Sequence, residues 1–566
     1  MADNKEQARE RRSQIEKVLL NNWIGPHRSQ VCAINEFKHW QVSEVEALFA
    51  LLPPLNDRKL SPHGPECRPP PRGNQRWKEL AMKTAIMGIT DLMVVAVSPL
   101  IVFSKTARKE TVPQLVKLHY DSIGSSFFVS SPMDMLRQAA QTKMAVCVNS
   151  WGRFSIRSSG YAAISHVWAE TMGLEFQDEK IMQDERGINY SHFSRIISKA
   201  AASSSCEWFW LDLLAVPQIV GNEDEATMLR ELKTNVVNSL INVYKNADTV
   251  IILDALTLQL SSEDPCDVAA ILSCGRWLTR MWTYQEIKLA RKAQIVTKTG
   301  AIDFEQMVCA LDARKQQSEE ASRHWHEIHL KFARLLPSDP RGVSLADVAF
   351  CCSDRNTEKD IDYARSVFAI LNLQWNATWD YDAAITHILK SRPQDAARIA
   401  NLQGRRGLPP PYSWAPRYLA RLTGVIIDGF VATENGLVGY WTTFLVQRVI
   451  RHGENKTDTK IIFHMELLNR HGKSFELLAG LPYHWSDKIA QWVEQAVPAG
   501  TARLLCATVP ENLLSDHDPV VMLMVIQGDG EEGSWEGAFG TVVGTAEMDD
   551  PNCTELDGEK LEWLLA

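Results

Sequence analysis

The stretch Gly160-Tyr-Ala-Ala-Ile-Ser-His-Val-Trp168 places two polar residues, Ser165 and His166, inside an apolar run of strand length. Such a run, with little alternation between apolar and polar residues, is typical of a strand buried on both faces of a sheet. An unpaired polar group buried there costs about 1–3 kcal/mol. Ser165 and His166 are therefore expected to pair with other polar groups in the core or to face a cleft.

Two later segments repeat this pattern of polar residues within Trp-rich apolar sequence. Trp208–Gln218 contains Asp212, and Arg276–Glu286 ends on the carboxylate of Glu286. The same cost of burial applies to each of them. Ser165, Asp212 and Glu286 are thus expected either to satisfy one another inside a core or to line a shared cleft.

Strands and helices alternate along the middle of the chain, which predicts an α/β fold with a parallel sheet. In such a sheet, ligands bind at the carboxyl ends of the strands, where Ser165, His166 and Asp212 are expected to lie. The predicted strands are Tyr161–Trp168, Trp208–Val216, Thr249–Asp254 and Gln294–Thr297, and the predicted helices are Ser191–Ala202, Glu223–Lys245 and Leu278–Arg291.

A chain of 566 residues is too long for one core, since domains hold about 100–200 residues. The run Pro409-Pro410-Pro411 marks one boundary, and short apolar runs typical of strands recur beyond it. The sequence predicts a mostly helical region over 1–150 with a Pro-rich loop at 52–76, an α/β domain over 151–300, a helical extension over 301–408, a β-rich module over 409–528 and an acidic tail over 529–566.

The composition is that of an ordinary soluble globular protein and argues against several classes of function. Hydrophobic residues make up 45% of the chain, charged residues 23%, and the net charge is −9. This negative charge, without a basic stripe carrying interleaved aromatics, argues against a protein built to bind nucleic acid. The eleven cysteines form no CxxC pair, and their odd number fits a reduced, intracellular protein.

No segment predicts a secretory signal, a membrane span or a metal site. The N-terminus is charged and has no apolar stretch behind it. The most apolar stretch, Ile89–Phe103, contains Asp91 and Pro99 and is shorter than the ~20 residues that a spanning helix needs. The histidines of His324–His329 have no Cys or Asp beside them to complete a tetrahedral set. A cytoplasmic protein without metal is expected.

The first segment resembles the opening block of the fungal heterokaryon incompatibility (HET) domain, which reads roughly Tyr-x-x-Leu-Ser-Tyr-x-Trp-Gly. Tyr161, Ser165 and Trp168 match this block. The second tyrosine of the block is His166 here, and its glycine is Ala169.

The later blocks of the family follow in the same order. In Trp-x-Asp-x-x-Cys-Ile-x-Gln, Asp212 and Gln218 match, but Ala215-Val216 replaces Cys-Ile. The block Arg-x-Trp-Thr-x-Gln-Glu is matched without a gap by Arg280–Glu286. A fourth fragment, Lys359–Leu371, is similar to the element that follows the domain, so the resemblance covers roughly residues 150–375.

The resemblance implies a protein of non-self recognition and regulated cell death, which acts through self-association or a protein partner. HET domains are regarded as distant relatives of TIR domains, which implies a TIR-like (flavodoxin-like) sheet. The string from Arg280 onward is similar to the Ser-x-Trp-Cys-x-x-Glu helix of TIR domains, because Trp282 and Glu286 keep its spacing of one helical turn.

Some TIR domains cleave NAD with that glutamate, so the resemblance implies a possible NAD glycohydrolase for which NAD is substrate and no cofactor is bound. A nearby carboxylate would stabilise the oxocarbenium-like state formed as nicotinamide leaves. Glu286 would be the catalytic residue, and the ligand-binding residues would be Ser165, His166, Asp212, Arg280 and Trp282.

The residues also allow structural roles. Glu286 could pair with Arg280 or Lys288, and Asp212 could cap a loop or pair with Arg280. The protein would then be a non-catalytic protein–protein interaction scaffold.

Overall fold

The structure is a computed structural model with two compact units, residues 1–337 and 338–566. The Pro-rich loop and the apolar stretch Ile89–Phe103 of the sequence analysis lie almost wholly outside the residues it describes. The structure describes residues 2–22, 37, 40–52, 81–82, 84–85, 88, 128–168, 187–217, 219, 223–316, 319–336, 342–357, 359–420, 422–454, 461–481, 487–507, 520–528, 538–548 and 558–566.

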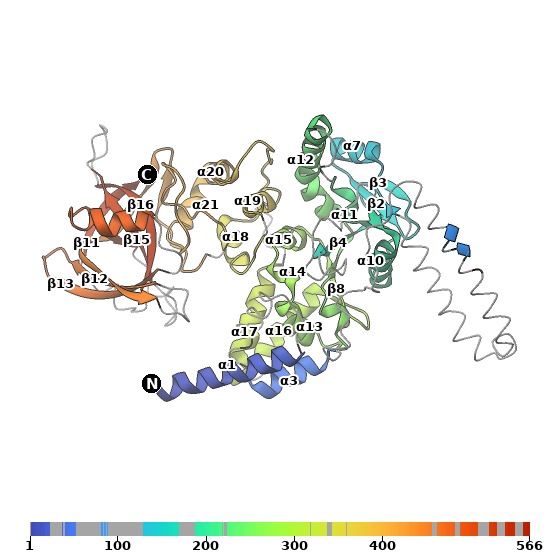
Figure 1. Ribbon diagram of the computed structural model, residues 1–566, viewed down its shortest axis with the longest axis horizontal. Coiled ribbons are helices and arrows are strands. Elements are labelled where there is room, and N and C mark those ends of the chain that lie inside the picture. The colour runs from blue at the N-terminus through green and yellow to red at the C-terminus, as the bar shows by residue number, and fades with distance from the viewer. Residues whose placement is uncertain are drawn as a thin grey trace. The chain divides into compact units, whose positions relative to one another are not determined.

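The first unit is built on a seven-stranded mixed sheet (Figure 1) of order β3-β2-β6-β4-β7-β8-β9. Its four central strands are parallel and, numbered by their order in the chain, lie in the order 2-1-3-4. The strands are β2 (Ala145–Asn149), β3 (Phe154–Arg157), β4 (Ala162–His166), β6 (Trp208–Trp210), β7 (Thr249–Leu253), β8 (Ala293–Val296) and β9 (Ala301–Asp303).

The prediction of a parallel sheet is right for the centre and wrong for the edges. The hairpin β2–β3 begins at Ala145, ahead of the predicted domain start at 151, and β2 runs antiparallel to β6. At the other edge β9 runs antiparallel to β8. The strands of the pairs β2–β3 and β8–β9 are close in sequence and are joined by tight turns, which reverse the chain, whereas a parallel neighbour needs a long crossover.

Helices cover both faces of this sheet. One face packs against α10 (Tyr190–Ser203), whose Phe193 and Ile196 contact a core that includes Ile164 and Ile251. The other face packs against α7 (Met133–Thr142) and α12 (Glu223–Asn246), which lie side by side in Figure 1. Burial of apolar side chains from both faces explains why these strands are uninterrupted hydrophobic runs.

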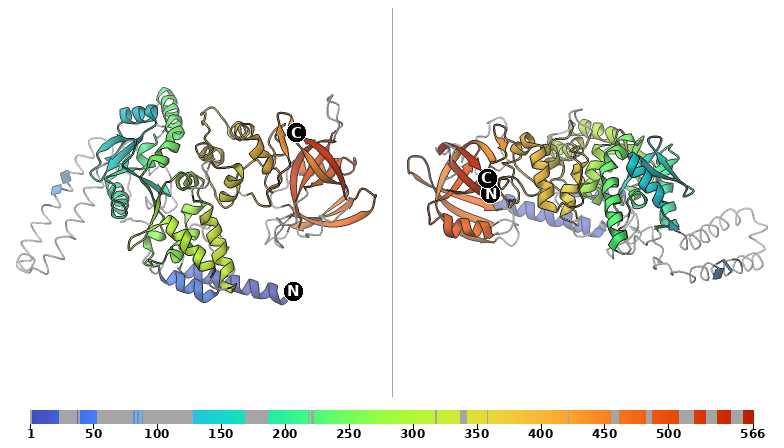
Figure 2. Two further views of the ribbon diagram at one scale, coloured as in Figure 1. Left: turned by 180° about the vertical axis from the view of Figure 1, so that it is seen from behind. Right: turned by 90° about the horizontal axis from the view of Figure 1, so that it is seen from above.

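The first unit contains further described helices, of which α1 and α3 lie side by side in Figure 2. A two-stranded ribbon joins β1 (Phe128–Val129) to β5 (Ile188–Asn189). The helices are α1 (Ala2–Asn22), α3 (Val42–Ala50), α11 (Asp212–Ala215), the 3-10 turn η2 (Thr257–Gln259), α13 (Pro265–Cys274), α14 (Arg276–Thr279), α15 (Met281–Lys288), α16 (Phe304–Lys315) and α17 (Glu319–Ala333).

Two predicted elements of this unit are divided in the structure. The second predicted strand ends at Trp210, and the chain turns into α11 at Asp212. The predicted helix over 278–291 is interrupted at Arg280, whose backbone is extended (φ −89°, ψ 136°). The hydroxyl of Thr283 donates to the carbonyl oxygens of Trp277 at 2.6 Å and Arg280 at 2.9 Å, which satisfies the carbonyl groups freed by this break.

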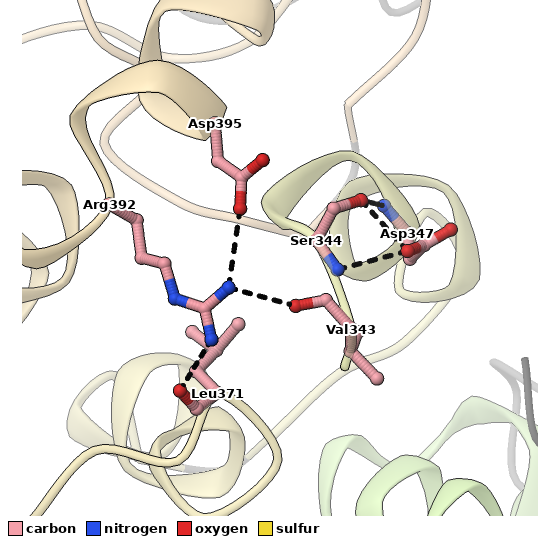
Figure 3. A network of polar contacts seen from close by, with 6 residues as sticks. All are labelled: Val343, Ser344, Asp347, Leu371, Arg392 and Asp395. Atoms are coloured by element: carbon pink, nitrogen blue, oxygen red, sulfur yellow. Dashed lines mark hydrogen bonds and ion pairs between the residues drawn. The ribbon is translucent and has the colours of Figure 1, made fainter. Parts of the chain in front are cut away.

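The second unit begins with four short helices: α18 (Leu345–Cys351), α19 (Ile361–Phe368), α20 (Tyr381–Ser391) and α21 (Pro393–Arg398). Figure 3 shows how polar contacts join them. The guanidinium of Arg392 donates to the carbonyl oxygens of Leu371 at 2.7 Å and Val343 at 3.4 Å and pairs with Asp395. Ser344 and Asp347 form a reciprocal capping box at the start of α18.

Beyond loops over 399–420 and 422–430, the second unit contains a closed β-barrel around an apolar core. Its ring is β11-β12-β13-β16-β15-β14, which closes because β14 also pairs with β11. The strands are β10 (Val431–Thr433), β11 (Gly436–Glu454), β12 (Ile461–Leu468), β13 (Ser474–Leu481), β14 (Ala502–Cys506), β15 (Val520–Gln527), β16 (Ala538–Met548) and β17 (Glu559–Leu565), with α22 (Asp487–Gln491) and a π-helical turn η3 (Trp492–Ala496) before β14.

Within the acidic tail expected over 529–566, the described residues 538–548 and 558–566 contain the strands β16 and β17. Strand β16 buries Val543 and Ala546 in the barrel core, and β17 pairs with both β11 and β16. In β17 the buried residues Trp563 and Leu565 alternate with partly exposed residues, among them Glu562, so its acidic composition gives little sign of a strand.

Candidate functional site

A buried polar cluster joins the end of β4 to three helices of the first unit. Ser165 on β4 donates a short hydrogen bond to Glu286 on α15 and accepts one from the indole nitrogen of Trp277 on α14 at 2.7 Å. The hydroxyl of Tyr244 on α12 also hydrogen-bonds to the carboxyl group of Glu286. We call Ser165, Tyr244, Trp277 and Glu286 the Glu286 cluster.

The sheet and its loops position these side chains. Alternate residues of a strand point to opposite faces, so Ser165 lies on the face that α12 covers, away from Ile164. The first turn of α14 is held by Asp254 at the end of β7. Its buried carboxylate accepts the backbone N–H groups of Leu256 at 3.0 Å, of Thr257 at 3.2 Å and of Trp277 at 3.5 Å.

The packing around this carboxylate leaves no room for a side chain at Gly275, the residue before α14. A Cβ atom at that position would overlap the carboxylate of Asp254. Burial raises the pKa of Asp254 to about 6, because the desolvation cost outweighs the three backbone hydrogen bonds. The position of Trp277 in the Glu286 cluster thus depends on a close contact between Gly275 and Asp254.

Burial also changes the ionisation of Glu286, which is only 7% exposed. Desolvation and, second, the negative charge of Asp212 raise the pKa of Glu286 to about 8. The hydrogen bonds from Ser165 and Tyr244 and the charge of Arg280 oppose this rise but are weaker. In the free protein at neutral pH, most molecules therefore carry Glu286 in its neutral, protonated form.

A second cluster lies at the carboxyl end of β6. The carboxylate of Asp212 lies 2.9 Å from Nε2 of His166 and accepts the indole N–H of Trp168 at 2.6 Å. It also accepts the backbone N–H of Leu213 at 2.7 Å, since Asp212 is the first residue of α11. The imidazole of His166 is fully buried, whereas the carboxylate of Asp212 is 20% exposed. We call His166, Trp168 and Asp212 the Asp212 cluster.

The two clusters flank the end of strand β4. Ser165 and His166 are neighbours on this strand and point to opposite faces of the sheet, one into each cluster. They pair with Ile252 and Leu253 of the adjacent strand β7. The charge of Asp212 acts on Glu286, so the two carboxyl groups are electrostatically linked.

The other two predicted ligand-binding residues lie near these clusters. Arg280 precedes α15 and is half-buried, and its charge is the weakest of the five influences that shift the pKa of Glu286. Trp282 lies one turn before Glu286 and is half-buried as well. Lys288, considered as a partner of Glu286, donates through its Nζ to the carbonyl oxygens of Arg334 at 2.9 Å and Leu336 at 2.6 Å.

Two residues of the Glu286 cluster were not predicted as site residues. Trp277 lies in one of the Trp-rich apolar segments, and its N–H needs an acceptor when buried, which is a signal for a polar neighbour. Tyr244 lies in the last turn of a long amphipathic helix, and its sequence context contains no comparable signal. Its ring packs 5.3 Å from that of Trp210.

The described residues include His324 and His329, which are packed or paired within the fold. Within them, no three or more His, Cys, Asp or Glu side chains are grouped closely enough to hold a metal ion. The ring of His324 packs 4.6 Å from that of Trp40, and His329 lies 3.5 Å from Asp312. No described helix combines the length and the apolar character needed to span a bilayer.

Compared with known proteins, the chain matches no protein-family model, and no curated protein and no solved structure matches it either.

Proposed function

We propose that this chain is a HET-domain protein of non-self recognition and regulated cell death, which cleaves NAD at the Glu286 and Asp212 clusters. The observation that carries the proposal is the gathering of Ser165, His166, Asp212 and Glu286 around the ends of β4 and β6. These residues come from the three sequence blocks that resemble the HET domain. The carboxyl ends of parallel strands are where α/β sheets bind ligands.

The order of the parallel strands supports a TIR-like fold for the first unit. Flavodoxin-like sheets have the order 2-1-3-4-5, and the four parallel strands here follow 2-1-3-4. In such sheets the ligand crevice lies between the first and third strands, which correspond here to β4 and β7. Ser165 and His166 stand at the end of β4 on this side.

The proposed chemistry breaks the bond between the nicotinamide nitrogen and C1′ of the ribose. The electron pair leaves with the nitrogen, which releases neutral nicotinamide and an oxocarbenium-like ribose. An ionised Glu286 would stabilise this positive charge, and water then attacks C1′ to give ADP-ribose and a proton.

This role requires the carboxylate form of Glu286. Its pKa of about 8 would fall when the positively charged nicotinamide ring binds beside it, because an opposite charge favours the ionised form. Since kcat/KM reports the ionisation of the free enzyme, kcat/KM should rise with pH and level off above about pH 8.

The test is nicotinamide release by the purified full chain at high concentration or on a crowding surface, because TIR-like enzymes tend to need self-association. Wild type should release nicotinamide and Glu286→Gln should not. Glu305→Gln, an exposed residue in the first turn of α16, is the matched control and should behave as wild type. If the wild type kills fungal cells on expression but releases no nicotinamide, the enzymatic proposal is wrong.

A specific observation favours a second candidate, a non-catalytic interaction scaffold. Glu286 is buried and already hydrogen-bonded to Ser165 and Tyr244, which is what a purely structural polar cluster requires. Under this reading, Glu286→Gln alters stability but leaves cell killing intact. Loss of killing at an unchanged melting temperature would instead favour the enzymatic proposal.

A further inference from the structure

A separate pocket of about 330 Å³ opens in the first unit between the end of α7, the end of β3 and the last turn of α12. Its lining includes Lys143, Arg157, Ser158, Tyr161, Asn242 and Asn246. None of the residues of the Glu286 and Asp212 clusters lines it. We call it the Arg157 pocket.

The charge of the Arg157 pocket favours an anion. Lys143 and Arg157 contribute two positive charges, and no carboxylate belongs to the described residues that line it. The last turn of α12 opposes this with the partial negative charge of a helix C-terminus, about half an elementary charge. The two positive charges of the side chains outweigh the partial negative charge of the helix end, so the pocket remains positive.

Arg157 is held in place for such a ligand. Its guanidinium lies 4.5 Å from the centre of the Trp208 ring, which fixes the plane of the group and leaves its edges free to donate. Its Nε is buried and finds no hydrogen-bond acceptor in the described part of the chain. Gly160, in the loop after β3, has a φ of +73°, a left-handed conformation that favours glycine.

The other walls of the pocket are polar and rigid. Asn242 and Asn246 lie one turn apart on the same face of α12 and are half-buried. The hydroxyl of Tyr161 donates to the carbonyl oxygen of Val243 at 2.6 Å, so this proton holds the pocket wall together and is not available to donate to a ligand. Lys143 follows α7 in the left-handed conformation (φ 54°) and contributes the second cation of the lining.

We propose that the Arg157 pocket binds a small phosphomonoester. The fork of Arg157 and the ammonium of Lys143 would bind the phosphate, while Asn242 and Asn246 would hydrogen-bond to the hydroxyl groups of the remainder. A volume of about 330 Å³ is at the small end of ligand pockets, which suits a sugar phosphate rather than a dinucleotide. The inference stands apart from the proposed cleavage of NAD.

The test is isothermal titration calorimetry of the full chain with ribose 5-phosphate, with ribose and acetate as probes that lack the phosphate. Ribose 5-phosphate should bind saturably and the other two should not. Arg157→Gln should weaken binding about tenfold or more. Arg153→Gln, which removes the same charge from an exposed position of the same hairpin, should bind as wild type.

Ser158→Asp provides a second variant that does not depend on changing the stacked arginine. Ser158 is exposed at the pocket, so the new carboxylate is not buried. It should repel the phosphate and weaken the binding of ribose 5-phosphate. The proposal is overturned if ribose 5-phosphate gives no saturable binding, if acetate or ribose binds equally well, or if Arg153→Gln weakens binding as much as Arg157→Gln. Glu286→Gln should bind ribose 5-phosphate normally, which separates failure here from failure of the NAD proposal.

Discussion

Replacing Glu286 by glutamine should change how the stability of the first unit depends on pH. The folded protein holds the proton of Glu286 with a pKa of about 8, against an ordinary value of 4.5. Because the pKa is raised on folding, the contribution of this group to stability is fully present below pH 4.5 and is lost as the pH rises to about 8. Glutamine has no proton to lose and escapes this effect.

The magnitude follows from the shift. Each pH unit between 4.5 and about 8 lowers the unfolding free energy of the wild type relative to Glu286→Gln by about 1.4 kcal/mol. Between pH 5.5 and 7.5 the difference should therefore grow by about 3 kcal/mol in favour of the variant. The amide of glutamine can still accept one of the two hydrogen bonds, from Ser165 or Tyr244. The free energy lost with the other hydrogen bond is the same at every pH.

Hydrogen exchange can measure this change within one unit of a two-unit protein, where a single unfolding free energy is poorly defined. The opening free energies of amides in β4 and β7 should be compared between wild type and Glu286→Gln at pH 5.5, 6.5 and 7.5. Amides of β12 and β13 in the second unit are the internal control and should not differ. Parallel pH trends in both proteins, or a variant that loses relative stability as the pH rises, would refute the reasoning.

Two further substitutions test the surroundings of this carboxyl group. Asp212→Asn removes the negative charge that raises the pKa of Glu286, so the pH-dependent loss of stability should end at a lower pH in the same exchange experiment. Gly275→Ala brings a Cβ atom into overlap with the carboxylate of Asp254 and should lower the stability of the first unit by about 1–3 kcal/mol. Gly300→Ala, where a Cβ atom meets no other atom within 4 Å, is the control and should leave the melting temperature nearly unchanged.

The parts of the fold that could be predicted from sequence are those with a strong local signal. Buried runs of β-branched and apolar residues predicted β4, β7 and β8 to within two residues, and helical periodicity predicted α10 and α12 equally well. The position of Ser165 at the end of such a run also indicated that it needs a buried partner.

The rest depends on contacts that the sequence does not encode locally. The chain leaves the sheet after Trp210 because Asp212 bonds to the backbone of Leu213 and to two aromatic side chains from β4 and its end. Tyr244 reaches Glu286 only through the packing of α12 on the sheet. The strands β16 and β17 gain their stability from a closed barrel, so their acidic, glycine-containing sequence gives no local sign of it.

The pairing of β11 has a consequence for synthesis on the ribosome. The first half of this strand, Leu437–Thr443, pairs with Leu565–Glu559 of β17, which is translated long after it. Until β17 emerges, that half of β11 presents unpaired backbone groups and apolar side chains such as Trp441, a combination that promotes aggregation. The pairing of β11 is thus completed only after translation has passed β17, and chaperones that cover exposed strands should associate with the nascent chain during this interval.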